Sequence, residues 1–453
     1  MEQQLNLYHS GLQHTITKNS IEKRHVFGFF YHLQRESCSY LQNQQMNHWV
    51  IYIDNNSKKK GFLKDFQRGE IPSELQEFTN KTGSLFSTFT LESFIDEEDK
   101  HDKKIISSEH QALETMSSGE QKRALLYYLL NESPDYIILD NPFDNLDNAF
   151  QEELKSILHH YSKSISFIQL ASRTSDTLAF INNYGKLTNH IFSRIKKVAQ
   201  TDSKPSSPFS EVRIPKSIEQ YSSFDCPLIS FNNVSISYGD KKILNNITWT
   251  VNPGDFWQLS GTNGSGKSTM LSMITGDNPK AFGQEIYLFG NKKGSGESVW
   301  DIKKKIGYYA PAMTNKFHGR HTVENMLISG LTDSVGLYTI PTEFQKRIIK
   351  QWLLLLDLHE VKDIYFNKLS TGKQRLVMTA RAMVKHPPLL ILDEPTAGMD
   401  DDSAALLVAL VNKIAHETET AIIFVSHRKE PLLEPEKVFT LIQSPNGSTY
   451  ITS

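Results

Sequence analysis

The stretch that decides the fold is Trp257–Leu271, WQLSGTNGSGKSTML, which carries the phosphate-binding pattern G-x-x-x-x-G-K-[ST] at positions 261–268. Glycine adopts positive φ at little steric cost, so such a loop can aim several backbone N–H groups at one anion. An apolar run at 256–259 precedes the loop and predicts a strand. A helix-like run follows it, so a positive helix end would face the same anion. The stretch therefore predicts a nucleoside triphosphate site.

Two side chains of this loop have specific expected contacts. Lys267 would reach the β- and γ-phosphates, and the hydroxyl of Ser268 would ligate Mg2+. The loop residues that we expect to contact ATP are Gly261, Thr262, Asn263, Gly264, Ser265, Gly266, Lys267, Ser268 and Thr269.

Composition narrows the setting. The 453 residues carry 49 basic and 51 acidic side chains, a net charge of −2, which gives no support for a nucleic-acid partner. The two cysteines, Cys38 and Cys226, match no metal-ligand spacing and favour a reduced, cytoplasmic setting. The first ten residues, MEQQLNLYHS, lack a signal-peptide core, and no run of 18 apolar residues occurs. We expect a chain that does not cross a membrane itself, although it could dock onto a protein that does.

The first half contains a degenerate copy of the loop. Trp49–Leu63, WVIYIDNNSKKKGFL, matches Trp257–Leu271 at an offset of 208 positions, and Lys59 falls on Lys267. Side chains replace the three glycines of the loop, so they would occupy the space of phosphate oxygens. The replacements are Ile53, Asn56 and Lys58, and Lys60 stands in the place of Ser268. We interpret this copy as a solvated basic turn rather than a site for a magnesium-bound nucleotide.

A second pair of segments confirms the duplication. From Ser117 to Asp140 is 23 positions, and from Ser370 to Asp393 is also 23. Each segment predicts a polar turn, an amphipathic helix and an apolar strand that ends in the aspartate. The chain is therefore expected to contain two copies of one module.

Three regions follow from this duplication. We predict a degenerate first domain at 1–196, a Ser/Pro-rich linker at 197–225 and a competent second domain at 226–453. The second domain would begin with two strands joined by a Gly-Asp turn. From the loop serine to the signature serine is 60 positions in the first copy and 105 in the second. Helix-like runs at 323–331 and 344–358 lie in the longer copy, so the first copy should have a reduced helical subdomain.

The ordered motifs GTNGSGKST, LSTGK, LLILDEP, AGMD and VSHR resemble those of an ATP-binding cassette (ABC) ATPase, and nearly the whole chain is similar to a tandem pair of cassettes. More narrowly, GSGESVWDIKKKIGYY, ENMLISGL and VKHPPLLILDEP resemble the molybdate-transport-associated or photorepair-type (ModF-like) proteins. The resemblance implies an α/β fold with two P-loop NTPase domains. Each would hold a mixed sheet, flanking helices and a helical subdomain.

The same resemblance assigns expected roles. Asp393, at the end of a predicted strand, would lie beside Mg2+, and Glu394 would activate the attacking water as general base. His427 would lie near the γ-phosphate and orient both water and base. Tyr238 would stack on adenine, with an ordinary strand aromatic as the alternative.

In this family ATP lies between the phosphate loop of one cassette and the signature turn of the other. The site at 261–269 would therefore be completed by Ser117, Ser118 and Gly119. The first half has Asn141 where Glu394 stands and Ser172 where His427 stands. We therefore predict that the cassettes pair within the chain and form one competent and one degenerate site. Asp140 and the LSTGK turn would then be structural.

One departure bears on function. Ordinary cassettes place a magnesium-contacting glutamine after the strand predicted at 306–313, where this chain has Ala310, Pro311 and Ala312. Hydrolysis would then be slow, or coupling would use another contact. The resemblance implies an ATP hydrolase that uses Mg2+ and energises a permease for molybdate, another oxyanion or a metal, at the inner face of the cell membrane. The alternatives are a soluble mechanical ATPase on a repair or ribosomal complex, and an ATP-driven binding switch.

Overall fold

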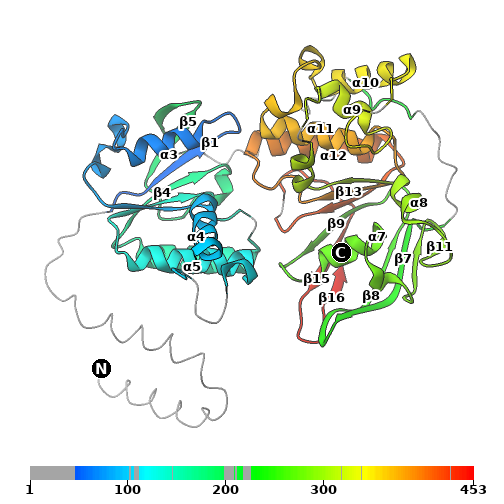
Figure 1. Ribbon diagram of the computed structural model, residues 1–453, viewed down its shortest axis with the longest axis horizontal. Coiled ribbons are helices and arrows are strands. Elements are labelled where there is room, and N and C mark those ends of the chain that lie inside the picture. Colours follow the sequence, from blue (N-terminus) through cyan, green and yellow to red (C-terminus); the bar gives the residue numbers. More distant parts are fainter. Residues whose placement is uncertain are drawn as a thin grey trace, which may run out of the picture. The chain divides into compact units, whose positions relative to one another are not determined.

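Two six-stranded sheets with the same topology form the framework of the chain, shown as a computed structural model in Figure 1. The structure describes residues 46–101, 104–106, 112–144, 146–197, 209, 212–217, 226–317, 319–337, 339–428 and 430–453. The predictions for residues 1–45 and for most of the linker fall outside this part. Residues 46–453 belong to one compact unit.

The first sheet has the order β2-β3-β4-β1-β5-β6, in which only the last pair is antiparallel. Its strands are β1 (Trp49–Ile53), β2 (Gly83–Phe86), β3 (Tyr136–Asp140), β4 (Ser166–Ala171), β5 (Asn183–Thr188) and β6 (Ile191–Ile195). Its helices are α3 (Lys59–Gln67), α4 (Thr88–His101), α5 (Ser118–Asn131) and α6 (Asn148–Tyr161).

The second sheet repeats this order as β12-β13-β14-β9-β15-β16, again with only the last pair antiparallel. Its strands are β9 (Phe256–Gly261), β12 (Ile306–Tyr309), β13 (Leu389–Asp393), β14 (Ala421–Val425), β15 (Lys437–Ile442) and β16 (Thr449–Thr452). The predicted α/β fold with a repeated mixed sheet is confirmed. Asp140 and Asp393 end equivalent strands, as their spacing predicted.

A separate antiparallel sheet, with the order β11-β10-β7-β8, belongs to the second half. It comprises β7 (Ile229–Tyr238), β8 (Lys241–Val251), β10 (Ile286–Leu288) and β11 (Asn291–Lys292). The predicted Gly-Asp turn joins β7 to β8, and Gly239 adopts the positive φ of +56° that this turn requires.

Helices account for the length difference between the halves. The second half has α7 (Lys267–Ile274), α8 (Val299–Lys304), α9 (Val323–Ser329), α10 (Glu343–Leu355), α11 (Thr371–Met383) and α12 (Asp401–Glu417). Helices α9 and α10 form where the apolar runs predicted them, whereas α4 alone occupies the corresponding interval of the described first half. None of the helices in the described ranges is long and apolar enough to span a bilayer.

One predicted strand is shorter than expected. The apolar run at 306–313 suggested a single strand, but β12 ends at Tyr309 and a 3-10 helix begins at Pro311. Proline lacks the N–H that a strand ladder needs, which explains the early end.

Each large sheet has an apolar core on both faces because its side chains alternate. Trp257 and Leu259 of β9 pack with α7 and the antiparallel sheet, whereas Phe256 packs with α9 to α12. In the first half, Ile51 packs with α3 and Val50 packs with α5. The phosphate loop and its degenerate copy therefore each follow the carboxyl end of a central strand that is packed on both faces.

The predicted linker contains two anchored residues. Phe209 and Ile214 are buried in the helical core of the second half, and the N–H of Ile214 donates to Glu417 at 2.8 Å. These two residues are therefore part of the packing of the second half. The domain boundaries themselves stay a prediction.

Candidate functional site

The predicted phosphate loop leaves β9 and enters α7 through three glycines in conformations that favour glycine. Gly261, Gly264 and Gly266 have φ values of +148°, +76° and +97°. A Cβ atom added at Gly266 would lie 2.7 Å from a methyl carbon of Leu244. The loop thus has a backbone that larger residues could not reproduce without strain.

The loop also fits a phosphate chemically. The Oγ atom of Ser265 is buried and has no hydrogen-bond partner among the described residues. Its hydroxyl is therefore free to donate a hydrogen bond to a phosphate oxygen. Lys267 donates from Nζ to the carbonyls of Gly261 and Thr262, at 2.7 and 3.0 Å. Burial lowers the pKa of Lys267. The remaining predicted residues lie here too: Thr262, Asn263 and Gly264 in the loop, and Ser268 and Thr269 in α7.

The two residues predicted to bind metal, Ser268 and Asp393, line one cavity together with the predicted base, Glu394. Ser268, Asp393 and Glu394 border a space of about 490 Å3. Its other lining residues are Asp144, Ala310, Pro311, Ala312, Arg375, Ala397 and Gly398. A hydroxyl and a carboxylate are oxygen ligands of the type that Mg2+ prefers, so this donor set fits the ion.

Tyr308 is a site residue that the sequence analysis missed. Its hydroxyl donates to Oδ2 of Asp393 at 3.2 Å. Burial raises the pKa of Asp393 and also that of Tyr308. A polar side chain one strand away therefore orients the carboxylate at the end of β13.

Glu394 and His427 are in contact. The Nδ1 atom of His427 lies 3.1 Å from Oε1 of Glu394, and the imidazole is almost fully buried. Burial acts to raise the pKa of Glu394, but the hydrogen bond from His427 and nearby positive charges outweigh it, so the pKa is lowered. Glu394 has a φ of +51°, and its N–H donates to Val425 at 3.0 Å. The bond to Val425 fixes the backbone of Glu394, and the contact with His427 fixes its carboxylate at the cavity.

The first half reproduces this backbone without these functional groups. Asn141 has a φ of +43°, and its N–H donates to Leu170 at 3.0 Å, as Glu394 does with Val425. Its amide donates to Ser172 at 3.1 Å. The pair therefore occupies the positions of Glu394 and His427 with neither a carboxylate nor an imidazole.

The degenerate loop differs from the second loop in its backbone. None of Ile53, Asn56 and Lys58 is at positive φ. The N–H of Lys58, the counterpart of Gly266, donates to the carbonyl of Asn189 at 2.8 Å. This amide is already committed within the protein, which agrees with the interpretation of a turn without a phosphate nest.

The two halves meet through their loops. The N–H of Asn263 donates to Asp147 at 3.1 Å, and that of Asn55 donates to Asp400 at 2.7 Å. Asp147 and Asp400 also cap the N-termini of α6 and α12. Each loop thus contacts the helix-capping aspartate of the other half, so the predicted pairing within the chain is present.

The predicted signature turn lies at the start of α5. Ser117 caps this helix, Ser118 is its first residue, and Gly119 packs beside Phe150 of its own half. A Cβ added at Gly264 would meet only Gln443 within 4 Å, so no described atom of the turn lies that close to this position. Closure of the turn over ATP stays a prediction.

Tyr238, the predicted adenine contact, lies at the end of β7. Its side chain is 46% exposed, and its hydroxyl accepts a hydrogen bond from Asn278 at 2.9 Å. Tyr238 is therefore not a buried core aromatic, and the Nζ atom of Lys280 lies 6.0 Å from the centroid of its ring. Adenine binding stays a prediction.

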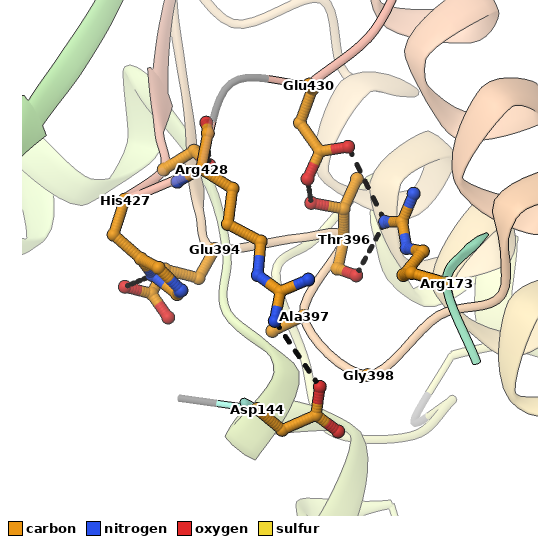
Figure 2. Close-up of a pocket in the computed structure, with 10 residues that line it drawn as sticks. Asp144, Arg173, Glu394, Thr396, Ala397, Gly398, His427, Arg428 and Glu430 are labelled. Carbon is orange, nitrogen blue, oxygen red and sulfur yellow. Dashed lines mark hydrogen bonds and ion pairs between the residues drawn. The ribbon is translucent and has the colours of Figure 1, made fainter. Parts of the chain in front are cut away.

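Sequence analysis also missed a set of charged residues beside Glu394. Arg173 and Arg428 line a cavity of about 10 Å3. Figure 2 shows Glu430 close to Arg173 and Asp144 close to Arg428. Because Arg173 and Asp144 come from the first half, this cluster spans the two halves.

Comparisons with known proteins agree with these features. A family model described as ABC transporter matches residues 244–397. The ABC transporter ATP-binding protein ModF of Escherichia coli (strain K12) is 37% identical over 328 residues, which cover 70% of this chain and 67% of ModF. An uncharacterised ABC transporter ATP-binding protein of Schizosaccharomyces pombe is 31% identical over 334 residues, covering 71% of this chain and 66% of that protein. The matches thus span about two thirds of these relatives.

A shorter match comes from a named uptake system. The zinc uptake system ATP-binding protein ZurA of Listeria innocua is 36% identical over 204 residues. This match covers 44% of the chain and 76% of ZurA.

Proposed function

Because this chain belongs to the family of ABC transporter ATP-binding proteins, whose members are ATPases, we propose that it hydrolyses magnesium-bound ATP at one composite site. The phosphate loop at 261–269 would bind the nucleotide. The signature turn at 117–119 of the degenerate half would close over it. The contacts of Asn263 with Asp147 and of Asn55 with Asp400 support this head-to-tail pairing.

The residues around the cavity have complementary tasks. Ser268 and Asp393 would hold Mg2+, with Asp393 oriented by Tyr308. Bound Mg2+ would neutralise charge on the phosphate oxygens. Lys267 would exchange its loop carbonyls for phosphate oxygens and stabilise the charge that develops during transfer.

Glu394 would accept the proton of the attacking water. Its lowered pKa keeps the carboxylate ionised at neutral pH, as a base requires. The hydrogen bond from His427 fixes the carboxylate, which leaves its other oxygen available for water. The bond to the γ-phosphate would then form as the bond to ADP breaks, in line.

One observation carries the proposal of a single active site. Glu394 with His427 and Asn141 with Ser172 occupy equivalent backbone positions, yet only the first pair holds a base. The test is Glu394→Gln, for which we expect turnover to fall about 10^2-fold or more while ATP binding persists. Asn141→Asp, which adds a carboxylate in the degenerate half, is the matched control and should leave turnover unchanged. Unchanged turnover in Glu394→Gln would refute this base.

For coupling, we propose that the chain energises a permease for an oxyanion of the molybdate type or for a metal, from the inner face of the membrane. The relatives ModF and ZurA are named as an ABC transporter protein and a zinc uptake protein, which supports this class. The test is affinity purification from detergent-solubilised membranes. An integral permease that co-purifies in stoichiometric amount would support the proposal.

A second candidate is a soluble ATPase or ATP switch that acts on a cytoplasmic complex. It is favoured by Ala310, Pro311 and Ala312, which line the cavity where family members use a glutamine to relay to membrane subunits. Recovery of soluble assemblies alone in the same purification would favour this candidate and contradict the transporter.

A further inference from the structure

Two arginines at equivalent positions cross between the halves in opposite directions. Arg428 follows His427, and its Nη2 donates to the carbonyl of Phe143 in the first half at 3.1 Å. Arg173 follows Ser172, and its Nη2 donates to the carbonyl of Thr396 in the second half at 3.3 Å. Phe143 and Thr396 each lie three residues after the aspartate that ends a strand. The exchange is therefore reciprocal, and we call these two residues the arginine pair.

Carboxylates complete the contacts of Arg428. Its guanidinium donates to both oxygens of Asp176, at 3.0 and 2.9 Å, and lies 3.8 Å from Asp144. Both acceptors belong to the first half. Both bonds to Asp176 come from Nη1, while Nη2 donates to Phe143, so the two guanidinium nitrogens hold two different groups of the first half.

Arg173 has matching partners in the second half. Its guanidinium lies 3.5 Å from Glu430 and 3.7 Å from Asp401. The hydroxyl of Thr396 donates to the other oxygen of Glu430 at 2.6 Å (Figure 2). Arg173 and Glu430 are only 8% and 6% exposed, so neither charge has bulk water as an alternative partner.

These anchors lie next to the proposed catalytic groups. Arg428 is the neighbour of His427, and Thr396 lies two residues after Glu394. Glu394 and His427, which are 3.1 Å apart, thus lie in two segments that are each attached to the degenerate half. The attachments are made through Thr396 and Arg428. All donors and acceptors in these attachments are protein groups, so none of them requires nucleotide.

We propose that the arginine pair positions Glu394 and His427 by tying both of their segments to the degenerate half, through contacts that persist without nucleotide. The positioning role rests on the proposed function, because it takes Glu394 as the base. The nucleotide-independent attachment does not rest on it. The degenerate half would then contribute both the signature turn and the alignment of the catalytic pair.

Attachment is tested by disulfide cross-linking of the full chain without nucleotide. Cys38 and Cys226 are first replaced by serine, and Asn55→Cys and Ser403→Cys are introduced, because the amide of Asn55 donates to Ser403 across the halves at 2.7 Å. We expect rapid oxidation in this parent and an approximately tenfold slower rate when Arg428→Met or Arg173→Met is added. Unchanged rates in both variants would overturn the attachment, whatever the ATPase activity.

Positioning is tested by steady-state kinetics. Arg173→Met should lower kcat about tenfold or more with KM for ATP within about twofold, because a small misplacement of a base has a large effect on rate. Arg173→Lys should recover part of the loss. In a Glu394→Gln background, Arg173→Met should cause little further loss, since the group that it positions is absent.

The control is Arg194→Met. Arg194 donates to Asn183 at 2.9 Å within the first half, and the variant should match the parent in both assays. A loss of kcat for Arg173→Met that is equally large in the parent and in the Glu394→Gln background would overturn the positioning role. So would a rise in KM alone.

Discussion

The Nζ atom of Lys59 lies 2.9 Å from Oδ1 of Asp140, so the counterparts of Lys267, the proposed phosphate ligand, and Asp393, the proposed magnesium ligand, form an ion pair. In the second half, Lys267 instead donates to loop carbonyls and Asp393 accepts from Tyr308. The ion pair supports the proposal that the first site is inactive. Its lysine and its carboxylate neutralise each other where a metal and a phosphate would need them.

We therefore predict one nucleotide per chain. In a Glu394→Gln background, calorimetric titration with magnesium and ATP should give a stoichiometry near one. Lys59→Met should keep this value, although it leaves Asp140 without its cation and should lower stability by about 1–3 kcal/mol. Lys267→Met should abolish binding. A stoichiometry of two that falls to one in Lys59→Met would contradict the prediction.

Tyr308→Phe should weaken the response to magnesium. The change removes the hydroxyl that orients Asp393 but keeps the ring, so packing is preserved. We expect the Mg2+ concentration that supports half-maximal nucleotide binding to rise roughly 10-fold, as for other residues that orient metal ligands. Binding of ATP in the presence of a chelator should be unaffected. Tyr309→Phe, in the apolar core on the other face, is the control. Superimposable magnesium titrations would count against the role.

Gly266→Ala should block nucleotide binding. Alanine would have to adopt a φ of +97°, which is strained for a residue with a side chain, and its methyl group would lie 2.7 Å from the buried Leu244, so the loop or the Leu244 side chain must shift. We expect loss of ATP binding and about 1–3 kcal/mol of destabilisation. Gly296→Ala is matched for backbone conformation, with a φ of +113°, but meets no atom within 4 Å. That variant should be mildly destabilised and should bind ATP normally. Equal ATP binding by both variants would argue against a role of the loop at 261–269 in binding the phosphates.

Lys122 should make the free energy of unfolding rise with pH in the alkaline range. Burial lowers the pKa of Lys122 to about 8, with Asp144 opposing the shift. Above pH 8 the folded chain releases this proton, whereas the unfolded chain keeps it until about pH 10.5, so stability rises with pH across this window.

The measurement is urea unfolding of the parent and of Lys122→Met. Between pH 7.5 and 9.5 the parent should gain about 2 kcal/mol relative to the variant. Titrating groups that do not interact with Lys122 contribute equally to both chains, so they cancel in the difference. Parallel pH profiles for the two chains would show that Lys122 does not titrate in this range.

Local features of the fold were predictable because they depend on neighbours in the sequence. The three loop glycines predicted a tight turn, and equal spacing placed Asp140 and Asp393 at the ends of equivalent strands. The error at 306–313 was also local, since Pro311 marked the end of the strand and the apolar run obscured it.

Contacts between elements could not be read from the sequence. Tyr308 meets Asp393 only because β12 pairs with β13 in one register, with Tyr309 opposite Leu392. The arginine pair depends on how the two halves face each other, and no local pattern encodes that. A repeat-aware alignment does place Arg173 on Arg428, which was the one available signal.

The backbone at Glu394 carries a further consequence. A glutamate at a φ of +51° adopts a conformation that asparagine tolerates better, and Asn141 occupies the equivalent place at +43°. The second half thus carries a local conformational penalty at Glu394 that the asparagine in the first half reduces. Replacing Glu394 with asparagine should then raise the melting temperature and abolish turnover. At this one residue, greater stability would come at the cost of catalysis.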